Sequence, residues 1–178
     1  PPTERRIVVI NKPDAPQSRI FVGELGVPRN NPDFIPLLLA DHAYGEDFTS
    51  RLNLKLRANE GLTYGASSSL QSFRTAGAFV TETFTRTEKT AEAVKMILDV
   101  QKDFAANPTT ATELSDGQKP IIGKFQLGLE TPEAVASRLI SGAVNGLPPD
   151  YWQGYVDKLK SATLDQVNAA AKKYRQPD

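Results

Sequence analysis

The sequence has 178 residues, of which 39% are apolar, and this is enough to bury a core in one compact domain. Lysine and arginine together number 21, and so do aspartate and glutamate, so no net charge attracts nucleic acid or an anionic membrane surface. The absence of cysteine excludes disulfides, thiolate nucleophiles and thiolate metal sites. No apolar run approaches the roughly 20 residues that cross a bilayer. Neither a nucleic-acid partner nor a membrane partner is predicted.

Two β-rich runs open the chain, at residues 6–11 and 18–25, and a breaker cluster with two prolines separates them. Apolar residues with helical spacing follow over residues 34–44, up to a glycine that ends the helix. A second helix, rich in cations, is expected over residues 50–60. Gly61 then follows, free to adopt the left-handed conformation that commonly ends a helix.

Residues 62–73 and 76–85 are extended runs joined by a short connection, which predicts an antiparallel pair. The pattern changes to helical spacing from residue 87 and stays helical to the end of the chain. Four strands and six or so helices in this order predict an α+β fold, with a mostly antiparallel sheet and helices packed on one face. The later helix starts are marked by capping boxes or prolines, at Thr110, Thr131, Pro149 and Thr163.

The chain is expected to form a single domain over residues 1–178. It opens on Pro1 and Pro2, with neither an initiator methionine nor a basic-then-apolar targeting segment. This start is typical of a piece of a longer polypeptide or of a processed product.

The common catalytic motifs are missing from the sequence. A hydrolytic zinc site needs three protein ligands, usually including two histidines, and the chain has only His42. The expected place of His42 is a surface or half-buried position on a helix. No G-x-S-x-G nucleophile elbow and no phosphate-binding glycine loop occurs. The chain is therefore not expected to hold a metal or to be catalytic by itself.

Residues 50–65 (SRLNLKLRANEGLTYG) join a cationic helix to a strand made of small residues. A helix end next to a strand is expected to bring Arg57 and Tyr64 close together in space. Arginine offers a fork of donors suited to peptide carbonyls or carboxylates, and tyrosine adds a hydroxyl on a rigid ring. The small residues leave room for another backbone alongside. The alternative on composition alone is an exposed basic helix followed by a close-packed strand.

Residues 45–52 (GEDFTSRL) and 56–65 (LRANEGLTYG) resemble the G-G-x-F-x-S-R-L…L-R-E-x-x-G-L-x-Y stretch of the pitrilysin/insulinase zinc metallopeptidases. That stretch belongs to the C-terminal half of these proteins, which lacks the zinc motif, as in the mitochondrial processing peptidase. Further runs at 128–136 (GLETPEAVA), 146–151 and 162–174 occur in the order that this half shows. The resemblance covers nearly the whole chain.

The resemblance implies that the two halves of such a protein have different roles. The catalytic half carries a His-x-x-Glu-His motif and binds zinc, and the second half closes a chamber over it. By resemblance, Arg57 and Tyr64 match the two positions that the second half supplies to the peptide substrate. They would hold the carbonyl near the scissile bond and stabilise the developing oxyanion. The implied partners are a peptide and a zinc-bearing half, on the same polypeptide or on another subunit.

Two departures from the family pattern carry expectations of their own. Glu46 stands where a second glycine is frequent, so the loop before residue 50 is expected to follow a different path and to bring a carboxylate near the site. The chain stops at Asp178, where the family continues into one more strand. An open sheet edge would follow, with self-association through it. By family likeness the expected compartment is the periplasm or the bacterial exterior, with the mitochondrion as the alternative.

Two other functions remain open from the sequence. The chain could be a structural subunit of a large assembly, as in the core proteins of respiratory cytochrome reductases, which share this fold. It could also be a peptide-binding module that needs no protease partner. Retention of both Arg57 and Tyr64 favours the substrate-binding half of a peptidase over the structural subunit.

Overall fold

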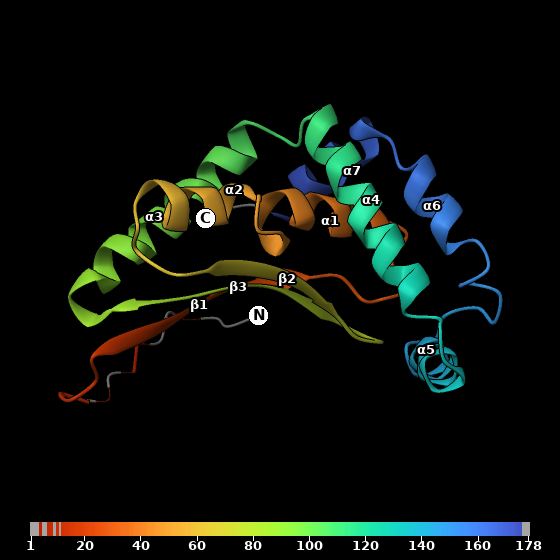
Figure 1. Ribbon diagram of the computed structural model, residues 1–178, viewed down its shortest axis with the longest axis horizontal. Helices are drawn as coiled ribbons and strands as arrows, with labels where there is room; N and C mark the ends of the chain where they lie inside the picture. The colour runs from red at the N-terminus through yellow and green to blue at the C-terminus, as the bar shows by residue number, and fades with distance from the viewer. Residues whose placement is uncertain (1–3, 5–6, 9, 11, 176–178) are drawn as a thin grey trace.

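The computed structural model describes residues 4, 7–8, 10 and 12–175. A layer of helices covers one face of a curved sheet and leaves the other face open, so that the molecule forms an arch (Figure 1). This arrangement confirms the predicted α+β fold with helices on one face. The sheet consists of β1 (Gln17–Gly26), β2 (Ala66–Ser72) and β3 (Gly77–Arg86), and the helical elements are α1 (Phe34–Asp41), η1 (His42–Glu46), α2 (Arg51–Asn53), η2 (Leu54–Asn59), η3 (Thr87–Lys89), α3 (Thr90–Ala106), α4 (Ala111–Leu127), α5 (Pro132–Val144), α6 (Tyr155–Ser161) and α7 (Leu164–Tyr174).

The described sheet has three antiparallel strands in the order β1-β3-β2, with β3 in the centre. The predicted pair formed by residues 62–73 and 76–85 is therefore confirmed as a hairpin, although β2 begins only at Ala66. The predicted strand at residues 6–11 lies in part outside the described residues. Its described positions are exposed and belong to no strand, namely Ile7, Val8 and Ile10.

Alternate residues of each strand face the helical layer, as the period of two requires. Thr81, Thr83 and Thr85 of β3 are buried on this face, next to a core that includes Leu52 and Leu56. Threonine suits such a position because its branched side chain packs on the pleat while its hydroxyl stays hydrogen-bonded. The hydroxyls of Thr83 and Thr85 donate hydrogen bonds to the backbone of the segment that precedes β2.

The helix caps that local sequence specifies are present. Thr110 and Glu113 form a reciprocal capping box at the start of α4, and Thr163 and Gln166 form another at the start of α7. Thr131 caps α5, with proline in the first turn. The prediction that a helix begins at Pro149 is wrong, because residues 149–154 form turns and α6 begins at Tyr155.

A buried ion cluster links the end of the described chain to the core. Arg175 is 5% exposed, and its Nη1 donates to Asp41 Oδ1 at 2.8 Å while its Nε lies 3.6 Å from Glu24 Oε2. The Ser68 hydroxyl also donates to Asp41. The guanidinium carbon lies 3.9 Å from the centre of the Tyr44 ring. The cluster therefore joins α1, β1, β2 and the residue that follows α7.

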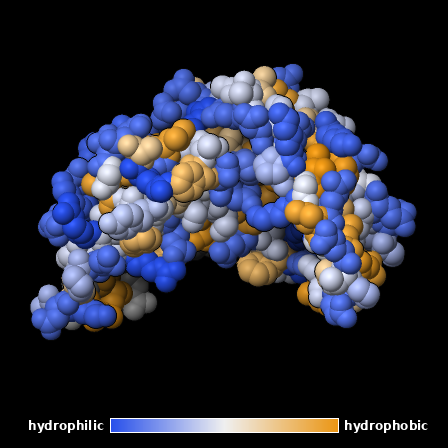
Figure 2. All heavy atoms as spheres, viewed as in Figure 1, coloured by the Kyte–Doolittle hydropathy of each residue, from blue (hydrophilic) through white to orange (hydrophobic). Residues whose placement is uncertain are grey.

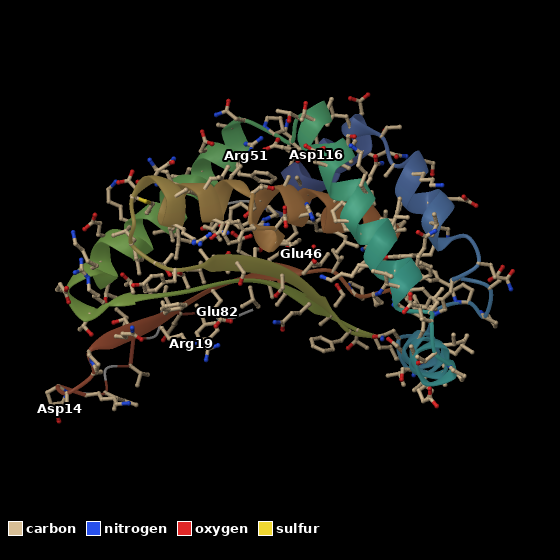
Figure 3. All side chains as sticks on the ribbon, in the orientation of Figure 1. Asp14, Arg19, Glu46, Arg51, Glu82 and Asp116 are labelled. Atoms are coloured by element: carbon tan, nitrogen blue, oxygen red, sulfur yellow. The ribbon has the colours of Figure 1, made fainter. Side chains whose placement is uncertain are left out.

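The open face of the sheet mixes aromatic, aliphatic and charged side chains. Phe21 and Leu25 of β1 are exposed there, and Phe84 of β3 is partly exposed. Arg19 pairs with Glu82 across the β1–β3 ladder, and both labelled side chains lie on the open side of the arch (Figure 3). None of the described helices is long and apolar enough to cross a membrane.

Candidate functional site

Arg57 lies on a helical segment that changes its winding just before it ends. The helix predicted over residues 50–60 is observed as one turn of α2 followed by the π-helical η2. It ends at Gly61, whose φ of +60° is the predicted left-handed conformation, and the Leu62 amide donates to the Leu56 carbonyl at 3.0 Å. A π segment widens the turn and is often found at functional sites. Sequence spacing does not distinguish such a turn from an ordinary α-helix.

The three cations of this segment have different surroundings. Arg51 binds Glu113, and Lys55 pairs with Glu60 at 3.0 Å. The Arg57 guanidinium instead lies 4.0 Å from the centre of the Phe48 ring, and it forms no ion pair or side-chain hydrogen bond within the described part of the chain. A guanidinium stacked on an aromatic ring keeps its in-plane donors available for a ligand. Arg57 therefore has a fixed position and free donors.

Tyr64 lies in a bend between η2 and β2, and not in a strand as predicted. The Thr83 hydroxyl donates to the Gly65 carbonyl at 3.0 Å, and the Thr85 hydroxyl donates to the Leu62 carbonyl at 2.7 Å. These bonds hold the backbone on both sides of Tyr64 while its side chain remains 85% exposed. An exposed aromatic side chain on an anchored backbone can meet a ligand at a small cost in ordering.

Asn53 connects the two sides of the site, and sequence reasoning missed it. Its amide nitrogen donates to the Phe48 carbonyl at 2.9 Å, and its amide oxygen accepts from the Ala66 amide at 3.3 Å. The residue is 5% exposed. Asn53 thus ties the segment that carries the ring under Arg57 to the first residue of β2. The only local signal was a polar residue on a helix face that is otherwise apolar.

A cavity of about 360 Å³ opens between these elements. Phe48 and Gly65 both line it, so the ring under Arg57 and the residue after Tyr64 lie on its wall. Neither Arg57 nor Tyr64 lines this cavity, but each is next to a residue that does, because the Arg57 guanidinium lies over the Phe48 ring and Tyr64 precedes Gly65 in the chain. The expectation that Arg57 and Tyr64 lie close together in space stays a prediction.

Carboxylates line the same cavity. Glu46 lies there at the end of η1, on the side of the helical layer that faces the sheet (Figure 3), and its Oε1 is 3.8 Å from the Lys124 amine. Asp47 follows it, and a hydrogen bond from the Thr49 hydroxyl at 2.7 Å lowers the pKa of Asp47. Glu46 therefore puts a carboxylate on the wall of this cavity, while the expected change in the path of the loop and a carboxylate close to Arg57 and Tyr64 stay predictions.

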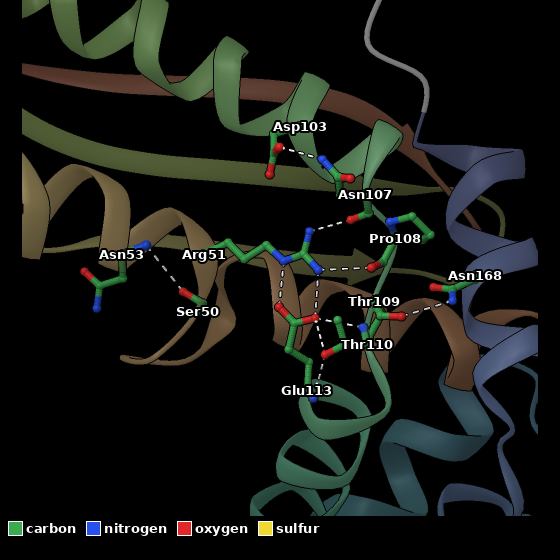
Figure 4. A network of polar contacts seen from close by, with 10 residues as sticks. All are labelled: Ser50, Arg51, Asn53, Asp103, Asn107, Pro108, Thr109, Thr110, Glu113 and Asn168. Carbon is green, nitrogen blue, oxygen red and sulfur yellow. Dashed lines mark hydrogen bonds and ion pairs between the residues drawn. The ribbon is translucent and has the colours of Figure 1, made fainter.

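Arg51, six residues before Arg57, has a structural role. Its guanidinium binds Glu113 through Nε at 2.6 Å and Nη2 at 2.7 Å, and it also donates to the carbonyls of Asn107 and Pro108 (Figure 4). The same Glu113 forms the capping box with Thr110. Arg51 therefore fixes the loop between α3 and α4. Local sequence does not predict this contact, because Glu113 is 62 residues away.

This ion pair predicts a loss of stability in acid. Burial acts to raise the pKa of Glu113, but hydrogen bonds from Arg51 and Thr110 outweigh it and lower the pKa from 4.5 to about 2. A lowered folded-state pKa contributes stability that is complete above pH 4.5 and is lost as the pH falls toward 2. We expect Glu113→Gln to cost about 1–2 kcal/mol at pH 7 and nearly nothing near pH 2.

Urea unfolding measured between pH 7 and pH 3 checks this expectation. Glu88→Gln is the matched control, because Glu88 pairs with Arg86 in an exposed position and its loss should change stability by less than about 0.5 kcal/mol. Equal pH profiles for Glu113→Gln and the unaltered chain would contradict the proposed contribution of Glu113.

His42 is buried in η1, and its ring packs against Gly117 of α4, where a Cβ would lie 3.1 Å from His42 Nδ1. This differs from the expected surface or half-buried position and explains the glycine within α4. Over the described ranges, no three His, Cys, Asp or Glu side chains are grouped so that they could hold a metal ion. A catalytic zinc therefore does not fit the described residues of this chain.

The fold is α+β, with helices on one face of an antiparallel sheet (Figure 1). Residues 1–120 match the family model described as the peptidase M16 inactive domain. The chain therefore belongs to the peptidase M16 family as an inactive domain. This confirms the resemblance seen in the sequence.

Relatives and solved structures agree with this assignment. An uncharacterised zinc protease of Mycobacterium tuberculosis is 25% identical over 167 residues, which are 94% of this chain and 38% of that protein. The peptidase M16 inactive domain from Pseudomonas fluorescens superposes with a TM-score of 0.84 and 26% identity over 92% of this chain and 39% of that one. The chain thus spans little more than a third of these relatives.

Two further similarities concern a relative that is not a peptidase and a structure from the periplasm. A protein of Helicobacter pylori described as a non-peptidase homologue, YmxG, is 27% identical over 128 residues, or 70% of this chain and 29% of that protein. The periplasmic protease PqqL from Escherichia coli shares the fold, with a TM-score of 0.76 and 18% identity over 90% of this chain and 18% of that one.

Proposed function

We propose that this chain is the substrate-binding, non-catalytic half of a zinc metalloendopeptidase that degrades peptides, and that Arg57 and Tyr64 bind the peptide. One observation carries the proposal: Arg57 is the cation of its helix that forms no ion pair or side-chain hydrogen bond among the described residues, and its guanidinium lies over the Phe48 ring. Phe48 lines a cavity together with Gly65, the residue after Tyr64. Arg51 and Lys55, by contrast, are held by acidic partners.

The chemistry of the two side chains suits a peptide carbonyl. A guanidinium donates two parallel hydrogen bonds, and a phenol adds one more from a rigid ring. Donors aimed at an oxygen that gains negative charge stabilise the transition state more than the ground state. Activation of the attacking water falls to the zinc-bearing half, since the described residues of this chain offer no metal-binding cluster.

Hydrolysis by the assembled protein tests the proposal. A fluorogenic peptide is offered to the zinc-bearing half alone, to that half with this chain, and to that half with Tyr64→Phe. Because only one hydroxyl is removed, we expect Tyr64→Phe to lower kcat/KM about 10-fold while the two halves still associate. Full hydrolysis by the zinc-bearing half alone, or an unchanged kcat/KM for Tyr64→Phe, would contradict the assigned role.

A structural subunit without peptidase activity is the second candidate, and one relative, YmxG, is described as a non-peptidase homologue. The unpaired Arg57 supports the peptidase instead, because a scaffold does not require a guanidinium whose donors are left unpaired among the described residues. Inactivity of the assembled protein toward every peptide offered would favour the scaffold.

We also propose the periplasm as the compartment. The support is the family likeness of the sequence together with a shared fold with a periplasmic protease. Self-association through an open sheet edge remains a separate prediction.

A further inference from the structure

Another cavity of about 360 Å³ lies between the segment that joins β1 to α1, the first turn of α1, and the segment that runs from the end of α5 into α6. A hydrogen bond of 2.8 Å from Arg29 Nη1 to the Tyr151 hydroxyl joins the first of these segments to the last. They meet at the end of the arch where α4, α5 and α6 gather (Figure 1). This cavity shares no lining residue with the cavity beside Phe48 and Gly65. It is therefore a separate place on the molecule.

Arg29 lines this cavity and is held in place by aromatic side chains. Its guanidinium carbon lies 3.7 Å from the centre of the Phe34 ring, and its Nη1 donates to the Tyr151 hydroxyl. Within the described part of the chain Arg29 forms no ion pair and no other side-chain hydrogen bond. A guanidinium carries several N–H donors, so one bond to a phenol leaves others for a ligand.

A second cation, Lys158 of α6, lies on the same aromatic ring. Its Nζ is 4.7 Å from the centre of the Tyr151 ring, and the Arg29 guanidinium carbon is 5.1 Å from that centre. Lys158 has no ion pair among the described residues, and no acidic residue is among those that line the cavity. Asp33, which is close in sequence, pairs with Lys173 at 3.1 Å. Because two cations around one ring repel each other, a bound anion would be stabilised here.

The other walls of the cavity are apolar or carry amides. Ile35, Leu147 and Pro148 supply apolar surface, and Asn30 and Asn31 add side-chain amides. In the space-filling view, apolar and hydrophilic side chains lie next to each other at this end of the arch (Figure 2). A ligand that suits such walls has an anionic group, an apolar group and polar atoms that an amide can bind.

We propose that this cavity binds the C-terminal carboxylate of a peptide whose last side chain is apolar. Arg29 takes the carboxylate through its remaining donors, and Lys158 adds a charge-assisted hydrogen bond. The apolar side chain is buried against the aliphatic wall, and the asparagine amides bind the peptide backbone. A cavity of this size holds a small ligand or the end of a peptide. The inference does not depend on the peptidase role, because the site is separate from Arg57 and Tyr64.

The aromatic rings argue against a nucleotide as the anion. Bases bind by stacking on open aromatic faces. Here the Arg29 guanidinium covers the Phe34 ring, and both cations lie around the Tyr151 ring. The rings therefore serve to position the cations, and the aliphatic wall is what remains for the body of the ligand.

Calorimetric titration of the complete protein that contains this chain provides the first test, with EDTA present so that no bound metal hydrolyses the probe. The probes are acetyl-alanyl-alanyl-leucine with a free carboxylate and the same peptide ending in an amide. We expect a Kd on the order of 0.1 mM for the acid, and binding of the amide at least about 10-fold weaker because the charge is lost. Equal affinities, or no binding of the acid at about ten times that concentration, would overturn the inference.

A pair of charge reversals on α6 assigns the binding to this cavity. Lys158→Glu is expected to weaken binding of the free acid at least about 10-fold, because a carboxylate would face the ligand. Lys160→Glu makes the same change at an exposed position of α6 outside the cavity and should change the affinity by less than about 3-fold. Circular dichroism is expected to show both variants folded, since both positions are exposed. Equal losses for the two variants contradict the site.

Arg29→Lys tests the contact with the guanidinium without removing its charge. The variant loses the paired donors, so we expect the affinity for the free acid to fall about 10-fold. An unchanged affinity would contradict the role of Arg29 even if Lys158→Glu behaves as expected.

Two further probes distinguish other sources of an anion. Isocaproate has the apolar chain and the carboxylate but no peptide bond, and inorganic phosphate has only the charge. Binding of both at least about 10-fold weaker than that of the acetylated peptide supports a peptide terminus. Isocaproate that binds as tightly as the peptide would overturn the peptide in favour of a small carboxylic acid, and phosphate that binds more tightly would overturn the carboxylate.

Discussion

Replacing Arg57 with alanine is expected to lower kcat/KM of the assembled peptidase by about 100- to 1000-fold, the usual cost of removing one donor to a developing oxyanion. The loss should fall on kcat more than on KM, since the interaction strengthens as charge develops on the carbonyl oxygen. Stability should change little, because the guanidinium has only the Phe48 ring as its side-chain contact among the described residues. Steady-state hydrolysis of a fluorogenic peptide, with urea unfolding of the same preparations, measures both quantities.

Three further variants make this result specific. Lys55→Ala removes a neighbouring cation that Glu60 already neutralises, and it should leave kcat/KM within about 3-fold. Arg57→Lys keeps the charge but loses the fork of donors, so it should recover only a small part of the activity. Arg51→Ala should lower the free energy of unfolding by about 2 kcal/mol while affecting hydrolysis less than Arg57→Ala. Similar losses for Arg57→Ala and Lys55→Ala would show that net charge alone matters.

The difference between Arg51 and Arg57 could not be predicted from the sequence, because it depends on tertiary contacts. Both are cations on one predicted helix, and nothing local distinguishes them. The structure separates them because Glu113 comes from a distant segment and binds Arg51, whereas Phe48 lies under Arg57. The resemblance to a family selected Arg57 from its place in a motif, while its physical state required the tertiary structure.

The secondary structure likewise divides into features that local residues determine and features that distant residues determine. The capping boxes of α4 and α7 and the left-handed Gly61 could be predicted, since each depends on residues within one turn. The bend at Tyr64 could not, because hydroxyls of Thr83 and Thr85 from β3 hold the backbone out of the strand. Likewise, the π-helical turns η1 and η2 leave no signature in hydrophobic spacing.

Replacing Arg175 with alanine is expected to destabilise the fold by about 3–5 kcal/mol, because Asp41 would keep a buried charge without its counter-ion. Asp41 is 1% exposed and holds Arg175 Nη1 at 2.8 Å. Glu24 also loses its contact with Arg175 at 3.6 Å. The midpoint of thermal unfolding should fall by about 10 °C for a chain of this length. Lys173 lies two residues before Arg175 and forms an exposed ion pair with Asp33, so Lys173→Ala should leave the free energy of unfolding nearly unchanged.

The pH dependence of the loss identifies its cause. Burial raises the pKa of Asp41, and Arg175 and the Ser68 hydroxyl act against this rise. Without Arg175 the pKa of Asp41 rises further, and an acid whose folded-state pKa is raised costs stability at every pH above that pKa. The penalty of Arg175→Ala should therefore grow as the pH rises above the ordinary value of 3.8 and should disappear as the pH falls toward it.

A double replacement separates charge from packing. Arg175→Met with Asp41→Leu removes both charges and keeps similar volumes, so it should recover most of the stability that Arg175→Ala loses. The guanidinium also lies 3.9 Å from the centre of the Tyr44 ring, and methionine can keep a contact there. If the double variant is as unstable as Arg175→Ala at pH 7, the loss comes from packing around Tyr44 and not from the unpaired carboxylate. Recovery would instead mean that the buried cluster adds little net stability and mainly fixes how the residue after α7 meets α1 and β1.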